Sequence, residues 1–284
     1  MEILLKLRKI IVLPILILTI LTSPVAVSSD SAELISTDTF VLEQALMMGQ
    51  GITTDGEYYY TSGAIAGIGL TFLAKFTVED MELVTVAMNP LPDKCEDRRN
   101  DHIGGISFYD GKIYASVEGG DECYACIVVF DSETLNPTGE VYDLPNSLYD
   151  DGIPWLAVDP ESGLLYASKW TDAEYIYVYD VNDSMKNIST IELSETIDRI
   201  QGGEFYNGKL YLSNDTKDIE NTKRILGVDV ATGEVGVAAL RDVGGNNIEA
   251  EGLTFREAAD GSVMHVLDYN KIVGIFVHHY KVDF

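Results

Sequence analysis

The stretch that decides the fold is Asp101–Gly119, with the sequence DHIGGISFYDGKIYASVEG. An apolar segment leads into Asp110-Gly111, a dipeptide typical of tight hairpin turns, and a second apolar segment, Ile113–Ser116, follows. This pattern predicts two antiparallel strands joined by a two-residue turn.

The same pattern occurs five times along the chain, beginning near residues 50, 104, 155, 201 and 251. A further strand-like segment follows each hairpin: Leu73–Thr77, Ile127–Asp131, Ile176–Asp180, Ile225–Val230 and Ile272–Val277. A polar turn and a fourth segment come next in most copies. Four antiparallel strands in a unit of about 50 residues predict one blade of a β-propeller.

The chain is therefore expected to be an all-β, five-bladed β-propeller that forms a single domain over residues 29–284. The last repeat shows only three strands before the chain ends at Phe284. We expect Asp38–Leu46 to supply the missing outer strand, because closing the ring removes open sheet edges. Six blades are the alternative, since the stretch from residue 46 to 99 has room for an irregular extra unit.

Residues 1–28 have the pattern of a secretory signal. Lys6, Arg8 and Lys9 precede an apolar run over residues 10–21, and Ala26-Val27-Ser28 resembles a cleavage site. A membrane anchor is the alternative, but the run is short for a span. We expect a mature protein that is secreted or periplasmic, free of the membrane after cleavage, and monomeric.

The net charge of the chain limits the classes of molecule that it is expected to bind. The formal net charge is −27 at pH 7, and removal of the basic signal makes it more negative. Such a charge argues against binding to nucleic acid or anionic membranes. It fits a small polar ligand or carbohydrate, a divalent cation such as Ca²⁺, or a saline habitat.

The chain has three cysteines, Cys95, Cys123 and Cys126. Export makes a disulfide feasible, and the loops that carry these residues are expected on the same face. We predict a disulfide from Cys95 to Cys123 or to Cys126. Three unpaired thiols are the alternative.

Propeller topology places the loops before the first strand, and those between the second and third strands, around one mouth of the central channel. Side chains expected to bind a ligand there are Gln50, Asp101, Trp155, Trp170 and Gln201. Three carboxylates could hold Ca²⁺, which prefers several oxygen ligands: Asp151, Glu249 and Asp268. Packing between blades is the alternative role for the tryptophans, and a solvated acidic rim is the alternative for the carboxylates.

Three residues are the candidates for catalysis if the protein is an enzyme. His102 could act as an acid or base, because imidazole titrates near neutral pH. Glu251 could assist as a second acid or base, and Arg199 could orient a substrate carboxylate or phosphate. The alternatives are a structural role for His102 and neutralisation of Asp198 by Arg199.

The first repeat resembles a known enzyme family. Residues Gln50–Gly63, with the sequence QGITTDGEYYYTSG, are similar to the opening blade of glutamine cyclotransferases. The repeats as a group resemble secreted propellers of the glutamine-cyclotransferase-like, gluconolactonase-like and quinoprotein-like kinds. We expect the acidic central funnel to bind a small polar ligand or carbohydrate, together with a divalent cation. The alternatives are a propeller enzyme, either a hydrolase or a glutamine-cyclotransferase-like acyl transferase, and a protein-interaction scaffold.

Overall fold

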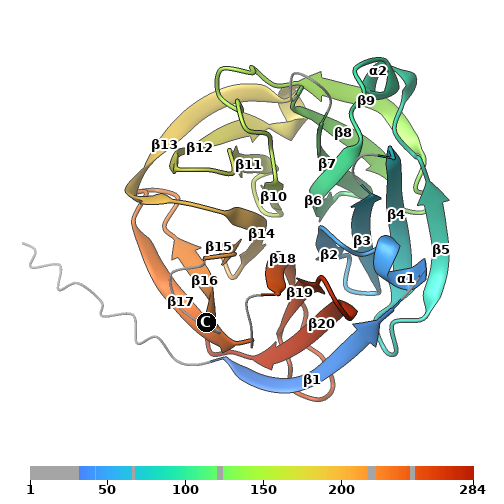
Figure 1. The fold of residues 1–284 in the computed structure, drawn as a ribbon. Coiled ribbons are helices and arrows are strands. Elements are labelled where there is room, and N and C mark those ends of the chain that lie inside the picture. The colour runs from blue at the N-terminus through green and yellow to red at the C-terminus, as the bar shows by residue number, and fades with distance from the viewer. Residues whose placement is uncertain (1–31, 42, 66–67, 120–123, 217–221, 244–246) are drawn as a thin grey trace, which may run out of the picture.

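The computed structural model describes residues 32–41, 43–65, 68–119, 124–216, 222–243 and 247–284. The predicted signal segment and Cys123 lie outside these ranges. Within them, twenty strands form five four-stranded antiparallel sheets arranged as a ring around a central channel (Figure 1). The predicted five-bladed propeller is confirmed, and the six-bladed alternative is wrong.

Each blade runs from an inner strand at the channel to an outer strand at the rim. The strands of blades 1 and 2 are β2 (Ile52–Thr54), β3 (Tyr58–Ile65), β4 (Leu70–Thr77) and β5 (Leu83–Met88), then β6 (His102–Tyr109), β7 (Lys112–Glu118), β8 (Cys126–Asp131) and β9 (Pro137–Asp143). Those of blade 3 are β10 (Trp155–Asp159), β11 (Leu164–Ser168), β12 (Ala173–Asp180) and β13 (Lys186–Ile197).

The strands of blade 4 are β14 (Ile200–Tyr206), β15 (Lys209–Asn214), β16 (Thr222–Val228) and β17 (Val235–Asp242). Those of blade 5 are β18 (Ile248–Phe255), β19 (Met264–Asn270), β20 (Gly274–Lys281) and β1 (Glu33–Phe40). Three short helical segments lie between strands: α1 (Glu43–Leu46), α2 (Asp93–Asp97) and a 3₁₀ turn (Val181–Asp183). No helix among the described residues is long and apolar enough to cross a membrane.

The predicted Asp-Gly hairpin joins β6 to β7. Asp110 and Gly111 have φ values of 48° and 73°, and Tyr109 pairs with Lys112 across the turn. Two consecutive positive φ values match the right-handed twist of the flanking strands, and Gly or a small polar residue tolerates them best. Asn207 and Gly208 repeat this geometry in blade 4, so the dipeptides that marked the repeat serve as turns.

Ring closure differs in detail from the expectation. The N-terminal strand is Glu33–Phe40, which pairs antiparallel with β20, whereas residues 43–46 form α1. The third strand of blade 5 begins at Gly274, and Ile272 lies in the exposed turn before it. The strand from the N-terminus was predicted correctly, but its position was displaced because the apolar residues near α1 pack beside blade 1 instead.

A chain of hydrogen bonds supports this closure. His265 Nε2 donates to the Arg256 carbonyl oxygen at 2.8 Å, and His279 Nε2 donates to the Asp38 carboxylate at 2.9 Å. The two Nδ1 atoms are 2.6 Å apart and need a proton between them. This geometry gives two rings three protons, one more than two neutral imidazoles hold. Burial lowers the pKa of His265 to about 4.

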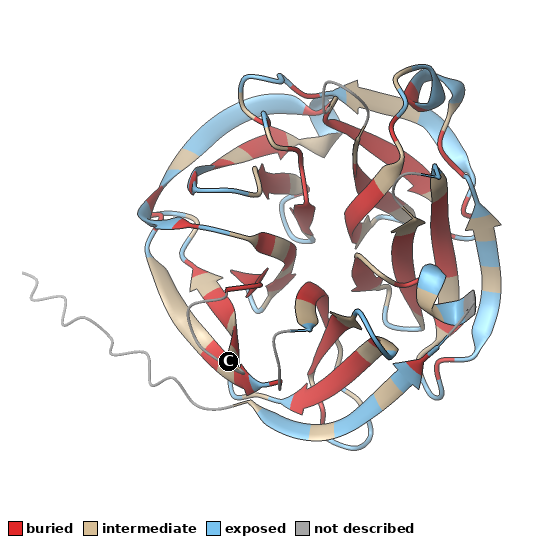
Figure 2. Cartoon of the chain, viewed as in Figure 1, coloured by how far each residue is buried: buried red, intermediate tan, exposed pale blue. Residues whose placement is uncertain are grey.

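The blades pack face to face through apolar side chains. Figure 2 colours much of the inner strands of the ring as buried. The inner strands approach one another most closely near the channel. A Cβ atom on Gly51 would lie 2.8 Å from the Ile106 nitrogen, and one on Gly252 would lie 2.6 Å from the Ile52 nitrogen. The repeated glycines at the strand starts therefore permit backbone contact between blades.

Candidate functional site

The predicted channel mouth is a belt of polar contacts that crosses blade boundaries. Glu118, at the end of β7, accepts a hydrogen bond from the Ile153 nitrogen just before β10. Asp151 accepts from the backbone nitrogens of Trp170 and Thr171, at 3.2 and 2.6 Å. The loops before the first strands and after the second strands therefore share one face, as the sequence predicted.

Arg199 continues this belt from blade 3 to blades 4 and 5. Its backbone nitrogen donates to the Trp170 carbonyl oxygen at 2.9 Å, and its guanidinium lies 4.8 Å from the centre of the Trp170 ring. The side chain pairs with Asp215 and, at 3.1 Å, with Glu249. The expected partner Asp198 is replaced by these two carboxylates, which lie farther along the chain.

Asp215 is the centre of this group of charges and was missed as a specific residue of the site. It is almost completely buried, pairs with Arg199 and Lys223, and accepts from the Ala250 nitrogen at 3.0 Å. Asp215 follows β15 directly, so its place between the second and third strands was the available signal. The spacing of residues in the sequence does not indicate that Arg199 and Lys223 pair with Asp215.

Glu251 lies beside these charges, but no hydrogen bond joins its carboxyl group to another described residue. The side chain is 3% exposed. Burial raises the pKa of Glu251 well above its usual value, and the carboxylates of Glu249, Asp215 and Asp268 raise it further, against the opposing effect of Arg199. Burial therefore favours the neutral form of the Glu251 carboxyl group, which can donate a hydrogen bond.

Asp268, expected as a metal ligand, belongs to a buried ion pair at the same blade interface. Its two oxygens accept from Arg241 at 2.7 and 3.1 Å, and His278 contacts it at 2.7 Å. Asp151, Glu249 and Asp268 thus have separate partners. Within the described residues, no group of three or more His, Cys, Asp or Glu side chains is arranged as a metal site.

His102 and Glu118 form the opposite side of the mouth, in blade 2. They are paired in register at the ends of β6 and β7. Burial lowers the pKa of His102, although Asp101 opposes the shift. Burial raises the pKa of Glu118 to about 7, helped by Asp151 and Asp101 and opposed by the Ile153 N–H. Both groups are neutral over part of the range near pH 7.

The remaining residues predicted to bind a ligand differ in how far their side chains are buried. Trp155 is completely buried between blades 3 and 4, and its indole nitrogen donates to the Ser168 hydroxyl at 2.9 Å. Trp170 is half-buried, and its indole N–H has no hydrogen-bond partner among the described residues. Gln50 and Gln201 are half-buried on the inner side of the ring. Of the two tryptophans, Trp170 is the one placed to meet a ligand.

The expected disulfide through Cys126 is absent. Cys95 and Cys126 are buried free thiols whose sulfur atoms are 3.9 Å apart. Cys95 sits in α2 and Cys126 begins β8, so the predicted proximity of these two loops is correct even though no bond joins them. The other expected partner, Cys123, lies outside the described residues.

Glu204 is a channel residue that sequence reasoning missed. It lies on inner strand β14, and its carboxyl group accepts from the Thr53 hydroxyl of blade 1 at 3.0 Å, across the ring. Burial raises the pKa of Glu204 to about 8, against hydrogen bonds from Thr53 and the Phe205 nitrogen. A glutamate within an otherwise apolar inner strand was the signal that could have found it.

Comparison with known proteins supports the fold. No family model and no curated protein sequence matches the chain. The major allergen Mala s 1 of Malassezia sympodialis is similar in structure, with 10% identity, coverage of 82% of this chain and 77% of the allergen, and a TM-score of 0.51. A luciferin-regenerating enzyme matches with 10% identity, 87% and 95% coverage, and a TM-score of 0.51.

Hydrazine synthase from Kuenenia stuttgartiensis also matches, with 12% identity, 81% coverage of this chain and a TM-score of 0.44, and this chain spans 59% of its length. The two matches with a TM-score of 0.51 support the fold alone, and identities of 10% say nothing of the chemistry of this chain. The narrower resemblance to glutamine cyclotransferases stays a prediction.

Proposed function

We propose that this propeller binds a small, neutral, hydroxyl-bearing molecule such as a carbohydrate at the channel mouth, between blades 3, 4 and 5. One observation carries the proposal: the indole N–H of Trp170 is buried and has no acceptor among the residues that the structure describes, and it lies beside the guanidinium of Arg199. A buried donor without a partner costs about 1–3 kcal/mol. A ligand oxygen would remove that cost.

Glu251, whose pKa is lowered by the nearby Arg199 but raised more strongly by burial, supports the same chemistry. In its neutral form, the carboxyl group can donate one hydrogen bond and accept another. A sugar hydroxyl also does both, so one ligand can satisfy Trp170 and Glu251. The aromatic face of Trp170 adds a surface of the kind that packs against the apolar face of a sugar ring.

The charge balance of the mouth favours a neutral ligand. Arg199 and Lys223 offset Asp215 and Glu249, while burial favours the neutral form of Glu251. An anion would meet carboxylates at short range, and a cation would have to compete with Arg199 and Lys223. Binding together with Ca²⁺ remains part of the prediction and has its own test below.

Tryptophan fluorescence tests the proposal, because the chain has only Trp155 and Trp170. Titration with glucose, galactose and N-acetylglucosamine should change the emission of the wild type in a saturable way. Trp170→Phe keeps a ring but removes the N–H, and should abolish the change. Trp155→Phe is the matched control and should keep it. A response that survives Trp170→Phe, or none from any sugar, would contradict the proposal.

Calcium is tested separately by the melting temperature. A Ca²⁺ ion held by the mouth carboxylates should raise the melting temperature at millimolar CaCl₂ more than MgCl₂ does, because binding to the folded state alone stabilises it. Glu249→Gln should reduce the shift. Equal or absent shifts with both salts would remove calcium from the proposal.

An enzymatic role is the second candidate, favoured by His102 and Glu118. A carboxyl group with a pKa of about 7, opposite an imidazole, has the properties of an acid–base pair. Glu251 would be a second acid, and Arg199 would position the substrate. Turnover of a lactone or a glutaminyl peptide by the wild type, lost in His102→Ala and Glu118→Gln with unchanged melting, would support catalysis. A protein indifferent to all these variants would be a scaffold.

A further inference from the structure

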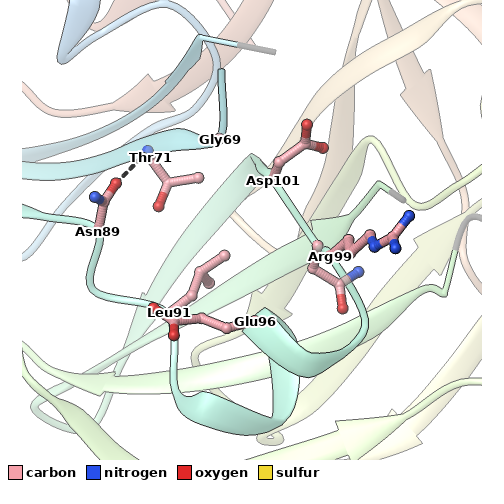
Figure 3. Close-up of a pocket in the computed structure, with 8 residues that line it drawn as sticks. Gly69, Thr71, Asn89, Leu91, Glu96, Arg99 and Asp101 are labelled. Atoms are coloured by element: carbon pink, nitrogen blue, oxygen red, sulfur yellow. Dashed lines mark hydrogen bonds between the residues drawn. The ribbon is translucent and has the colours of Figure 1, made fainter. Parts of the chain in front are cut away.

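A second opening lies at the rim between blades 1 and 2, away from Trp170 and Arg199. It is a cavity of about 310 Å³, lined by Gly69, Thr71, Asn89, Leu91, Glu96, Arg99, Asn100 and Asp101. Figure 3 shows Thr71 and Asn89 on one side, Arg99 and Asp101 on the other, and Leu91 with Glu96 between them. The walls come from blade 1 and from the α2 segment that leads into blade 2.

One wall residue has an unmet hydrogen-bond requirement. Asn100 is 5% exposed, and its Nδ2 donates to the Tyr124 carbonyl oxygen at 2.7 Å. That bond fixes the orientation of the amide, and the buried Oδ1 atom has no donor within the part of the chain that the structure describes. Buried acceptors are normally satisfied, so this oxygen calls for a donor from a molecule in the cavity.

The charges of the cavity specify what kind of donor fits. Glu96 and Asp101 bring two carboxylates, and Arg99 brings one guanidinium, so the lining carries a net negative charge. Asn89 uses its Oδ1 to accept from the Thr71 nitrogen at 3.1 Å. Acceptors with excess negative charge suit a cationic donor, and an ammonium group offers three N–H bonds.

We propose that this rim cavity binds a small molecule through its ammonium group, which donates to Asn100 Oδ1 and to the carboxylates of Glu96 and Asp101. The source of the ammonium group is a simple amine or an α-amino acid. An amino acid would place its carboxylate near the Arg99 guanidinium. The cavity volume admits such molecules with room for a few waters.

Binding is measured by NMR titration of the purified full chain, following the backbone amide signals of Gly69 and Thr71. The probes are methylammonium chloride, glycine and sodium acetate. Methylammonium or glycine should shift both signals in a saturable way, with a Kd of about 10 mM or tighter. Acetate should not. If glycine binds tighter than methylammonium the ligand class is amino acids, and if the two bind equally it is simple amines.

Variants keep the assignment falsifiable. Glu96 is exposed on α2. The variant Glu96→Gln should weaken ammonium binding about threefold or more. Asn100→Ser removes the acceptor and should weaken it further, with a dispersed spectrum as the check on folding. The matched control Glu133→Gln, an exposed carboxylate in the turn after β8, should change nothing. Trp170→Phe should also leave this binding intact, which separates it from the channel mouth.

The proposal is overturned if no ammonium probe gives saturable shifts at Gly69 and Thr71. It is equally overturned if acetate binds in preference to methylammonium, or if Glu96→Gln and Asn100→Ser both bind like the wild type.

Discussion

Two blade interfaces of the same ring differ in the kind of side chains that they bury. Between blades 1 and 2 the buried layer is apolar, with Ile103, Val128 and Phe130 among its members. Between blades 4 and 5 a smaller apolar cluster shares the interface with buried ion pairs, Arg241 with Asp268 and Lys223 with Asp215. The apolar layer of the first interface needs no matching of charge, whereas the second interface is stable only while each charge keeps its partner.

The difference teaches where function is expected to lie. Replacing a buried ion pair by apolar residues is often neutral or stabilising, so such pairs are weak evidence for a stabilising role. A cluster of buried, mutually dependent charges with a strongly shifted carboxyl pKa is, by contrast, typical of binding and catalytic sites. The charged interface borders Arg199 and Trp170, which agrees with the proposed ligand site.

The largest effect is expected from breaking the buried pair. Arg241→Ala leaves Asp268 without its main counter-charge in a water-free interface, which should cost about 3–5 kcal/mol of unfolding free energy. Urea unfolding at pH 7 measures it. The double variant Arg241→Met, Asp268→Leu should recover most of that loss. A loss below about 1 kcal/mol in the single variant would show that the pair is hydrated in solution.

The apolar interface supplies the matched comparison. Ile103→Ala should cost about 2–4 kcal/mol, through lost burial and the cavity it leaves, and Ile103→Val about 1 kcal/mol. Because no carboxyl or imidazole group contributes to this term, the loss should be the same at pH 5 and pH 8. A loss that varied with pH would erase the proposed contrast between the two interfaces.

Glu251→Gln should stabilise the protein at neutral pH. The pKa of Glu251 is higher in the folded state than its unfolded value of 4.5. Below pH 4.5 the carboxyl group is protonated in both states and costs the fold nothing. As pH rises from 4.5 toward the folded pKa, the free energy of unfolding falls, because only the unfolded state loses the proton readily. Gln mimics the protonated acid without this penalty. The gain at pH 7 should be on the order of 1–3 kcal/mol and should shrink toward pH 4. A destabilised variant at pH 7 would indicate an ionised Glu251.

The smallest effect is expected from a charge pair on the outside of blade 2. Lys112 pairs with Glu140 at 2.8 Å, with both side chains more than one third exposed. Lys112→Met should change the unfolding free energy by no more than about 0.5 kcal/mol, and salt should reduce even that. A loss comparable to that of Arg241→Ala would mean that burial does not separate the two kinds of ion pair.

The sequence predicted the repeating parts of the molecule well. Asp110-Gly111 and Asn207-Gly208 have a local cause, the backbone geometry of a hairpin, so they revealed the blades without any long-range information. The face shared by Glu118, Asp151 and Arg199 also followed from topology alone. The ends of the chain were less predictable, because Glu33–Phe40 pairs with β20 through contacts distant in sequence.

Side-chain partners could not be predicted in the same way. Trp155 and Trp170 are the same residue type on one blade, yet one is sealed between sheets and the other lies at the channel mouth. Arg241 on an outer strand gave no sign that it would meet Asp268 on the next blade. Interblade contacts depend on the rotation of one sheet against another, and no local pattern encodes that rotation.

The clasp between β1 and β20 has a consequence for how the molecule is made. Asp38 and His279 lie 241 positions apart, so β1 has no partner until β20 has been synthesised. Loop-closure entropy grows only slowly with such a separation, and each doubling costs about 0.6 kcal/mol. The separation in sequence therefore adds little to the free-energy cost of pairing, but it postpones the pairing. We expect β1 to dock only after β20 has formed.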